Sequence, residues 1–339
     1  ATIKSFKGWR PRTDLVDQVA ALPYDVYNRE EAKKEIEGKP YTFLRIDRAE
    51  TAFDDSVDTY DARVYDKVKE ILNKMMSDGV YVQDTQDVYY IYELIMNGRS
   101  QTGIVALASI DDYCNGVIKK HENTRADKEQ DRINHVDICN AQTGPIFLAY
   151  RARKTINEVV GKAKKEAPLY SFTSKDGIGH NVWMISNPED IDSIKTEFAN
   201  MDSIYIADGH HRAASAVKVG LKRREADKNY TGDEEYNFFL SVLFPDEELM
   251  IMPYNRVVKD TNGLSIEELM NRISDNYVIT PVNEAYEPEK KGIFGMYTGD
   301  VWYKLEAKEN ILSDDPVEGL DVSILQNTIL NPILGIEDP

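Results

Sequence analysis

The sequence contains little cysteine and no long apolar run. Cys114 and Cys139 are the only cysteines in 339 residues, and they do not form a CxxC pair. Two such residues can build neither a disulfide framework nor a cysteine-rich zinc site, so we expect reduced thiols and a cytoplasmic location. No stretch approaches the roughly 18 apolar residues of a transmembrane helix, and the N-terminus lacks a signal-peptide core. We therefore expect no membrane partner.

Basic residues are also scarce. Lys and Arg number 41 against 59 Asp and Glu, which gives a net charge of −18. This charge repels phosphate backbones, and no helix-turn-helix pattern offsets it, so we do not expect nucleic acid as a partner. The chain also lacks the P-loop, the dinucleotide-binding glycine motif, the GxSxG nucleophile elbow and the HExxH zinc motif. With 42% hydrophobic and 29% charged residues, the composition is that of a folded globular protein.

Helix and strand patterns are mixed along the chain, which predicts the α+β class. Apolar residues three and four apart predict a long helix within 54–76. An Asn-Gly pair at 97–98 predicts a hairpin turn between two strands. A buried strand is expected at 203–207, followed by a helix at 213–219 that Gly220 ends.

The length is about twice that of a common domain, which predicts two domains or one elaborated domain. We assign an N-terminal α+β region to 1–112, a central core to 113–236 with an insertion at about 151–202, and a C-terminal α+β region to 237–339. An apolar stretch comes directly before the end, so we expect the natural chain to extend beyond Pro339. The sequence leaves open whether the chain forms a homo-oligomer.

Three of the five histidines lie in two short polar clusters, which are the main functional clue. The second cluster is Asp208-Gly209-His210-His211-Arg212, and it stands where an apolar strand turns into an Ala-rich helix. The free N–H groups and the dipole of a helix start attract anions, and glycine lets a phosphate approach the backbone closely. Imidazole and guanidinium groups add donors and charge, so this cluster predicts a phosphate site.

The first cluster contains His121, Glu122, Asn123 and Thr124. A carboxylate at the mouth of a site can act as a general base, so Glu122 is the candidate base. His121 would bind phosphate or orient the base. Asn123 and Thr124 are candidate substrate-facing residues.

Simpler explanations compete with each assignment. Asp208 could only cap the helix, because aspartate is a common N-cap residue. The first cluster could be a solvated, charged end of a strand. Tyr24 and Asp25, within Leu-Pro-Tyr-Asp, could face the substrate or only form a turn.

Taken in order, these segments resemble the ParB/sulfiredoxin superfamily. The resemblance rests on 117–122, the helix from Asp131, the Gly-Pro-Ile-Phe strand at 144–147 and the strand and turn at 204–212. It implies a ParB/sulfiredoxin-like mixed core with extra strands and helices around it. The upstream His-Glu pair and the Asp-Gly-His-His-Arg motif resemble the free-serine kinases, mainly over 113–220. The whole chain resembles the family named domain of unknown function ten-fifteen, through the pairs Arg10-Pro11, Pro23-Tyr24, Thr102-Gly103 and Asn331-Pro332.

The resemblance implies a kinase that transfers a phosphoryl group to the hydroxyl of free L-serine or a similar small metabolite. Glu122 would accept the hydroxyl proton, and Asp208 would organise the turn or hold Mg²⁺. The donor phosphates, from ATP, ADP or pyrophosphate, would be held by Gly209, His210, His211 and Arg212. This division of labour suits phosphoryl transfer, in which positioning and charge neutralisation dominate.

Two other classes of function stay open. The same turn could belong to a non-catalytic nucleotide-sensing module, in which a bound phosphate ligand changes a partner interaction. A metal-dependent hydrolase would use His121, His210 and His211 as ligands. The sequence does not choose the donor, the acceptor or the role of the C-terminal region.

Overall fold

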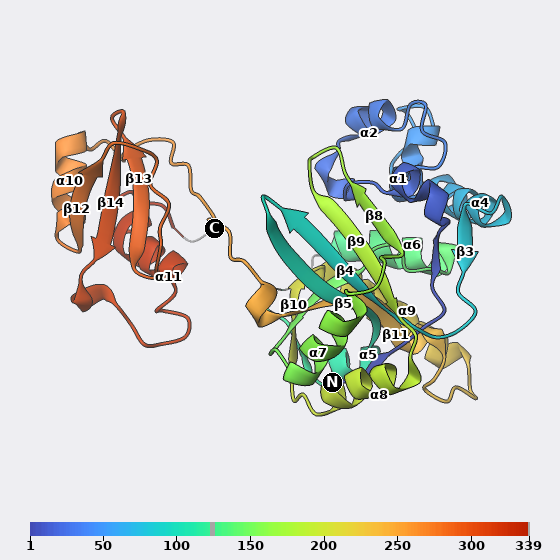
Figure 1. Cartoon of the computed structure of the whole chain (residues 1–339). Helices are drawn as coiled ribbons and strands as arrows, with labels where there is room; N and C mark the ends of the chain where they lie inside the picture. The colour runs from blue at the N-terminus through green and yellow to red at the C-terminus, as the bar shows by residue number, and fades with distance from the viewer. Residues whose placement is uncertain (123–125, 338–339) are drawn as a thin grey trace. The chain divides into compact units, whose positions relative to one another are not determined.

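The computed structural model describes residues 1–122 and 126–337, with the side chains of all of these except 126–128. Two compact units are present, unit 1 over Ala1–Ile251 and unit 2 over Met252–Pro339 (Figure 1). Each unit combines helices with β-sheet, which confirms the α+β class. None of the helices in the described residues combines the length and the apolar character of a membrane-spanning segment.

The main sheet of unit 1 contains nine strands among the described residues. Eight of them follow the order β6-β10-β7-β11-β5-β4-β9-β8, and β1 pairs with β5 beside this path. Two neighbouring pairs, β6/β10 and β7/β11, are parallel. The bounds are β1 Ile3–Lys4, β4 Tyr89–Met96, β5 Arg99–Ser109, β6 Ile118–Lys119, β7 Ile146–Tyr150, β8 Tyr170–Thr173, β9 Gly179–Ile185, β10 Ile204–Asp208 and β11 Phe238–Pro245.

The predicted Asn-Gly turn joins β4 to β5. Asn97 and Gly98 both have positive φ, 51° and 79°, as a two-residue turn matched to the twist of a hairpin requires. The turn places Met96 opposite Arg99 in the antiparallel register. The geometry confirms the predicted hairpin turn, which could be predicted because an Asn-Gly pair is a local signal.

Strand β11 decides where unit 1 ends. Sequence patterns placed region boundaries near residues 112 and 236, whereas the compact units divide between Ile251 and Met252. Strand β11 follows residue 236 yet lies between β5 and β7 in the main sheet. Such pairing joins residues far apart in the sequence, so periodicity near residue 236 does not reveal it.

Helices cover the sheet of unit 1 (Figure 1). The long helix expected within 54–76 is α4, which starts after the cap residue Asp61 and buries Val64, Val68 and Leu72. A separate two-stranded pair is formed by β2 Trp9–Pro11 and β3 Tyr81–Gln83. The helix bounds in unit 1 are α1 Val16–Val19, α2 Arg29–Glu35, α3 Leu44–Asp47, α4 Ala62–Ser77, α5 Ile110–Cys114, α6 Ala126–Cys139, α7 Lys154–Ala163, α8 Pro188–Ala199 and α9 His210–Ala226.

Helix α9 continues through the glycine that was expected to end it. Gly220 lies inside α9, which runs on to Ala226. A side chain at this position would overlap the backbone oxygen of Tyr236 and touch Ile110. The glycine therefore allows close packing of α9 on its neighbours, which the sequence pattern alone cannot distinguish from a helix stop.

Unit 2 is a smaller sheet with its own apolar core. Its strands follow the order β12-β14-β13 and are all antiparallel. Leu269, Ile273, Tyr277 and Leu305 are buried in its centre. The bounds are α10 Ile266–Ser274, β12 Tyr277–Val282, β13 Ile293–Thr298, β14 Val301–Ala307 and α11 Asp321–Leu325.

Candidate functional site

Strands β6 and β10 bring the two polar clusters together. They are parallel neighbours, with Ile204 opposite Ile118. Parallel strands end at the same edge of a sheet, so the residues that follow each strand meet there. His121 follows β6 and His210 follows β10, and the two residues are in contact although they stand 89 positions apart. A single site thus forms from segments that the sequence separates.

The turn into α9 has the features of an anion site. Gly209 adopts a left-handed conformation, φ 93° and ψ 32°, directly before the 17-residue helix. No side chain caps α9, so its first N–H groups have no partner within the helix. Asp208 therefore does not act as the cap. The uncapped N–H groups and the helix dipole leave a positive end at the edge of the sheet.

Arg212 lies across this turn. Its Nη2 donates to Asp208 Oδ2 at 2.6 Å, and its Nη1 donates to the Pro145 carbonyl at 2.5 Å. A Cβ atom on Gly209 would lie 3.2 Å from Arg212 Nε. The absence of a side chain at residue 209 therefore leaves room for the guanidinium group. Asp208 thus holds Arg212 beside the start of α9.

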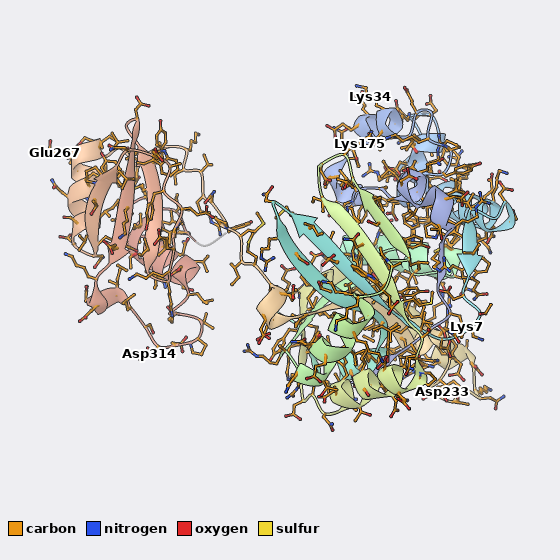
Figure 2. The ribbon with its side chains drawn as sticks, in the orientation of Figure 1. Lys7, Lys34, Lys175, Asp233, Glu267 and Asp314 are labelled. Atoms are coloured by element: carbon orange, nitrogen blue, oxygen red, sulfur yellow. The ribbon has the colours of Figure 1, made fainter. Side chains whose placement is uncertain are left out.

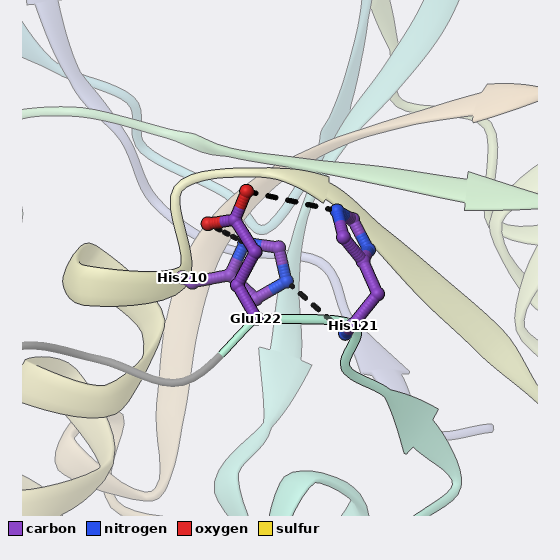
Figure 3. Close-up of side chains that lie close together, drawn as sticks. All are labelled: His121, Glu122 and His210. Carbon is purple, nitrogen blue, oxygen red and sulfur yellow. Dashed lines mark hydrogen bonds and ion pairs between the residues drawn. The ribbon is translucent and has the colours of Figure 1, made fainter. Parts of the chain in front are cut away.

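Glu122 faces two imidazoles (Figure 3). Its Oε2 lies 3.4 Å from Nδ1 of His210, and its Oε1 lies 4.0 Å from Nε2 of His121. The two imidazole rings are nearly perpendicular, with centroids 4.4 Å apart. His210 is buried, whereas Glu122 keeps 62% of its side chain exposed. A buried imidazole therefore supports a carboxylate that a ligand can reach.

The surroundings of His210 favour its neutral form. Burial lowers its pKa first, the neighbouring His121 lowers it further, and Glu122 opposes the shift. Nε2 of His210 accepts the backbone N–H of His121 at 3.5 Å. The proton of the neutral ring therefore belongs on Nδ1, which faces the carboxylate of Glu122. This arrangement orients the carboxylate of Glu122.

The same three side chains could hold a metal ion. One donor atom each from His121, Glu122 and His210 lies within 4.8 Å of the others. Two imidazoles and a carboxylate suit zinc or a similar transition metal, whereas Mg²⁺ prefers oxygen ligands. His211 does not belong to this set, and its Nδ1 is buried without a hydrogen-bond partner.

The other predicted residues lie elsewhere. Tyr24 is in the 3-10 turn η2, Tyr24–Val26, where its ring contacts the guanidinium of Arg132 at 4.5 Å. Asp25 is exposed. Asn123 and Thr124 lie outside the described residues. Tyr24 therefore lines a different part of unit 1 from the two clusters.

That part is a cavity of about 110 Å³ which sequence reasoning missed. Asp47 from α3, Tyr65 from α4 and His135 from α6 line it together with Tyr24 and Arg132. Burial raises the pKa of Asp47 to about 7, and Arg132 and Arg212 oppose the shift. Because Arg212 also forms the anion turn, the cavity and the turn are neighbours. The only sequence signal was the spacing of Asp131 and His135, four residues apart on one helix face.

Comparison with known proteins identifies the family. No curated protein and no solved structure matches the chain. One family model, described as "Protein of unknown function (DUF1015)", matches residues 3–323, which span nearly the whole chain. The protein therefore belongs to the DUF1015 family.

Proposed function

We propose that the protein is a phosphotransferase that phosphorylates the hydroxyl group of a small metabolite, with free L-serine as the first candidate. The observation that carries this proposal is the position of Glu122, whose carboxylate lies 3.4 Å from His210 at the uncapped start of α9. A base and an anion site are thus adjacent, as transfer of a phosphoryl group to a hydroxyl requires.

Each group at this edge of the sheet has a role in the proposed reaction. The N–H groups at the start of α9 and the guanidinium of Arg212 hold the donor phosphates and neutralise their charge. Glu122 accepts the proton of the acceptor hydroxyl, and neutral His210 fixes the orientation of the carboxylate. Most of the rate enhancement in such a site comes from positioning and charge stabilisation.

Mg²⁺ bound with the donor would neutralise its phosphate charge. Among the described residues, the carboxylates of Asp208 and Glu122 offer oxygen ligands at this site. Mg²⁺ commonly keeps several waters and takes further ligands from phosphate groups, so one protein carboxylate is sufficient. We assign this role to Asp208, because Glu122 is needed as the base.

The order of elements supports the finer resemblance. Strand β6, helix α6, strand β7, strand β10 and helix α9 follow one another in the order of the ParB/sulfiredoxin pattern, with α7 to α8 inserted before β10. On this proposal the phosphate turn and the His-Glu pair keep the positions that they have in free-serine kinases. The insertion changes the surroundings of the donor.

Product formation tests the proposal. The full chain is incubated with L-serine and Mg²⁺ and, in parallel, with ATP, ADP or pyrophosphate, and O-phosphoserine is measured by mass. We expect product with one donor and a loss of about 10²- to 10⁴-fold in Glu122→Gln. Glu225→Gln is the matched control, since Glu225 is an exposed residue near the far end of α9, the helix whose start forms the anion site. Tight nucleotide binding without turnover, together with a ligand-dependent change in oligomeric state, would instead favour a sensing module.

A metal-dependent hydrolase is the second candidate. The convergence of His121, Glu122 and His210 within 4.8 Å favours it. In that case a transition metal would activate a water, and Glu122 would be a ligand instead of a base. Elemental analysis of the purified protein decides: one equivalent of zinc or a related metal, lost in His210→Ala, would replace the kinase proposal.

A further inference from the structure

The charged lining of the cavity is not balanced. Its carboxylates are Asp47, Glu50 and Asp131, and its guanidinium groups are Arg48 and Arg132. Arg48 Nε lies 2.6 Å from Glu50 Oε1, and Arg132 Nη2 lies 2.7 Å from Asp131 Oδ2. Within each of these two pairs the charges compensate each other. Asp47 is the remaining carboxylate of the lining, and no guanidinium group of the lining forms an ion pair with it.

Asp47 has no ion-pair partner in the part of the chain that the structure describes, although the side chain of Thr143 forms a hydrogen bond with it. Its side chain lines the cavity and keeps some exposed surface there, although desolvation by the surrounding protein is strong. Burial raises its pKa, because an ionised carboxylate without a close counter-charge is costly in a desolvated place. A cationic ligand in the cavity would supply the missing counter-charge.

The second group is one ring nitrogen of His135, whose other nitrogen, Nδ1, contacts Cys139 Sγ at 3.9 Å. His135 is 4% exposed and lines the same cavity, and its Nε2 has no hydrogen-bond partner. Burial lowers its pKa to about 4, so the ring is neutral near pH 7 and can accept a hydrogen bond. A buried polar atom without a partner costs about 1–3 kcal/mol, so such an atom in a cavity indicates a place for a ligand.

Aromatic rings complete the lining. Tyr24, Tyr60 and Tyr65 all border the cavity. The face of a tyrosine ring attracts cations, as the contact of Tyr24 with Arg132 illustrates. The volume of about 110 Å³ holds only a few water-sized groups, since one water takes up roughly 30 Å³ in the liquid. The occupant is therefore small.

We propose that this cavity binds the ammonium group of a small amino compound, which pairs with Asp47 and donates a hydrogen bond to Nε2 of His135. An ammonium group has three donors and a positive charge, and the cavity offers a carboxylate without a counter-charge, an imidazole nitrogen without a hydrogen-bond partner and aromatic faces. Identification of this compound as the phosphoryl acceptor rests on the proposed function, because Arg212 is near both Asp47 and the phosphate turn. The acceptor class is then the small amino alcohols.

Titration calorimetry of the full chain, without any phosphate donor, tests the binding. The probes are L-serine and ethanolamine, which carry an ammonium group, and D-glycerate, which has a hydroxyl and a carboxylate but no ammonium. We expect ethanolamine, L-serine or both to bind, and D-glycerate to bind at least tenfold more weakly. Failure of both amines to bind, or binding of D-glycerate as tight as theirs, would overturn the proposal.

Variants locate the bound group. Asp47→Asn keeps the size of the side chain and removes its charge, so we expect it to weaken amine binding at least tenfold. Asp66→Asn is the matched control, because Asp66 is an exposed residue of α4, the helix that carries Tyr65. Unchanged amine binding in Asp47→Asn would place the amine elsewhere and overturn the proposal. Thermal unfolding of each variant shows that it is folded.

The two proposals fail in different ways. Amine binding that needs Asp47, without phosphorylated product from any donor, would leave the cavity assignment standing and remove the kinase. Product formation that is unaffected by Asp47→Asn, with no amine binding in the cavity, would leave the kinase standing and remove the cavity as its acceptor site.

Discussion

The two units of the chain differ in what they bury. Among the described residues, every buried charged side chain and every histidine lies in unit 1, including Glu50, Glu93, His135 and His210. The buried core of unit 2 is made of side chains such as Ile273 and others that carry no charge. Charged groups that Figure 2 labels on unit 2 are at its surface. Burial of ionisable groups is costly, so unit 1 bears an energetic cost that the core of unit 2 does not.

Within unit 1, buried charges are of two kinds. Glu93 is surrounded by partners: Lys164, Ser100 and Asn181 all donate to it. Among the described residues, Asp47 has no ion-pair partner and Nε2 of His135 has no hydrogen-bond partner, and both side chains line a cavity. Groups with a full set of partners hold the fold together, whereas a carboxylate without a counter-charge and an imidazole nitrogen without a partner can interact with a ligand in the cavity. The comparison between the units is therefore sharpest at these two residues.

The largest expected effect concerns the packing of α9 against Tyr236. Gly220→Ala places a methyl group on the backbone oxygen of Tyr236, which cannot move away easily. We expect a loss of at least ~4 kcal/mol in the free energy of unfolding of unit 1, measured by denaturant titration. Gly161→Ala is the control, since Gly161 is an exposed helical glycine with open space around it, and it should stabilise by roughly 0.5–1 kcal/mol. Equal stability of the two variants would contradict the close packing of α9.

The second effect is the pH dependence that Asp47 causes. Its pKa in the folded chain is about 7, above the ordinary value of 3.8, so the fold favours the protonated carboxyl. Its contribution to stability is complete below about pH 4 and is lost as the pH rises to about 7, by about 4 kcal/mol in total.

The variant Asp47→Asn should remove this loss. We measure the free energy of unfolding of the variant and the parent from pH 4 to pH 8. The value for the variant, relative to that for the parent, is expected to increase as the pH rises. Asp66→Asn should follow the parent throughout. Parallel profiles of the parent and Asp47→Asn would show that the cavity carboxyl has an ordinary pKa, and the contrast between the units would weaken.

A third substitution tests the apolar core of unit 2. Ile273 is fully buried in unit 2, so Ile273→Ala should cost about 3 kcal/mol in the stability of that unit. Ile266, 39% exposed on the same helix α10, is the control, and Ile266→Ala should cost well under 1 kcal/mol. Amine binding in the cavity of unit 1 is expected to stay unchanged in both variants. A loss of binding in Ile273→Ala would mean that unit 2 contributes to the site.

The smallest effect is one that the units share. Asn28 in unit 1 and Ser265 in unit 2 each form a capping box, with Glu31 and Glu268 as their partners. Asn28→Ala and Ser265→Ala should each cost about 1 kcal/mol by denaturant titration, because a cap acts locally. Clearly unequal losses would show that the contribution of a capping box to the free energy of unfolding depends on the unit that surrounds it.

Features with local signals were predictable from the sequence. The periodicity of α4, the Asn-Gly hairpin and the Gly209 turn all depend on residues within a few positions of one another. The meeting of His121 with His210 was expected only from the resemblance, since it depends on the parallel pairing of β6 with β10. The predicted roles of both histidines remain predictions.

Features that depend on distant contacts were not predictable. Gly220 is a packing glycine because Tyr236 lies against it, and no pattern near residue 220 contains that information. The cavity needs Asp47, Tyr65 and His135, from three separate helices, so their meeting could not be inferred from spacing. The boundary of unit 1 depends on β11, whose partners β5 and β7 lie far upstream.

A crystal structure of the full chain with Mg²⁺ and pyrophosphate, the moiety common to the candidate donors, tests the central claim most directly. The account predicts phosphate oxygens within hydrogen-bond distance of the N–H groups of residues 210–212 and of the Arg212 guanidinium, with Glu122 free to face the acceptor. Pyrophosphate bound away from the start of α9, or a metal held by His121, Glu122 and His210 in its place, would contradict it.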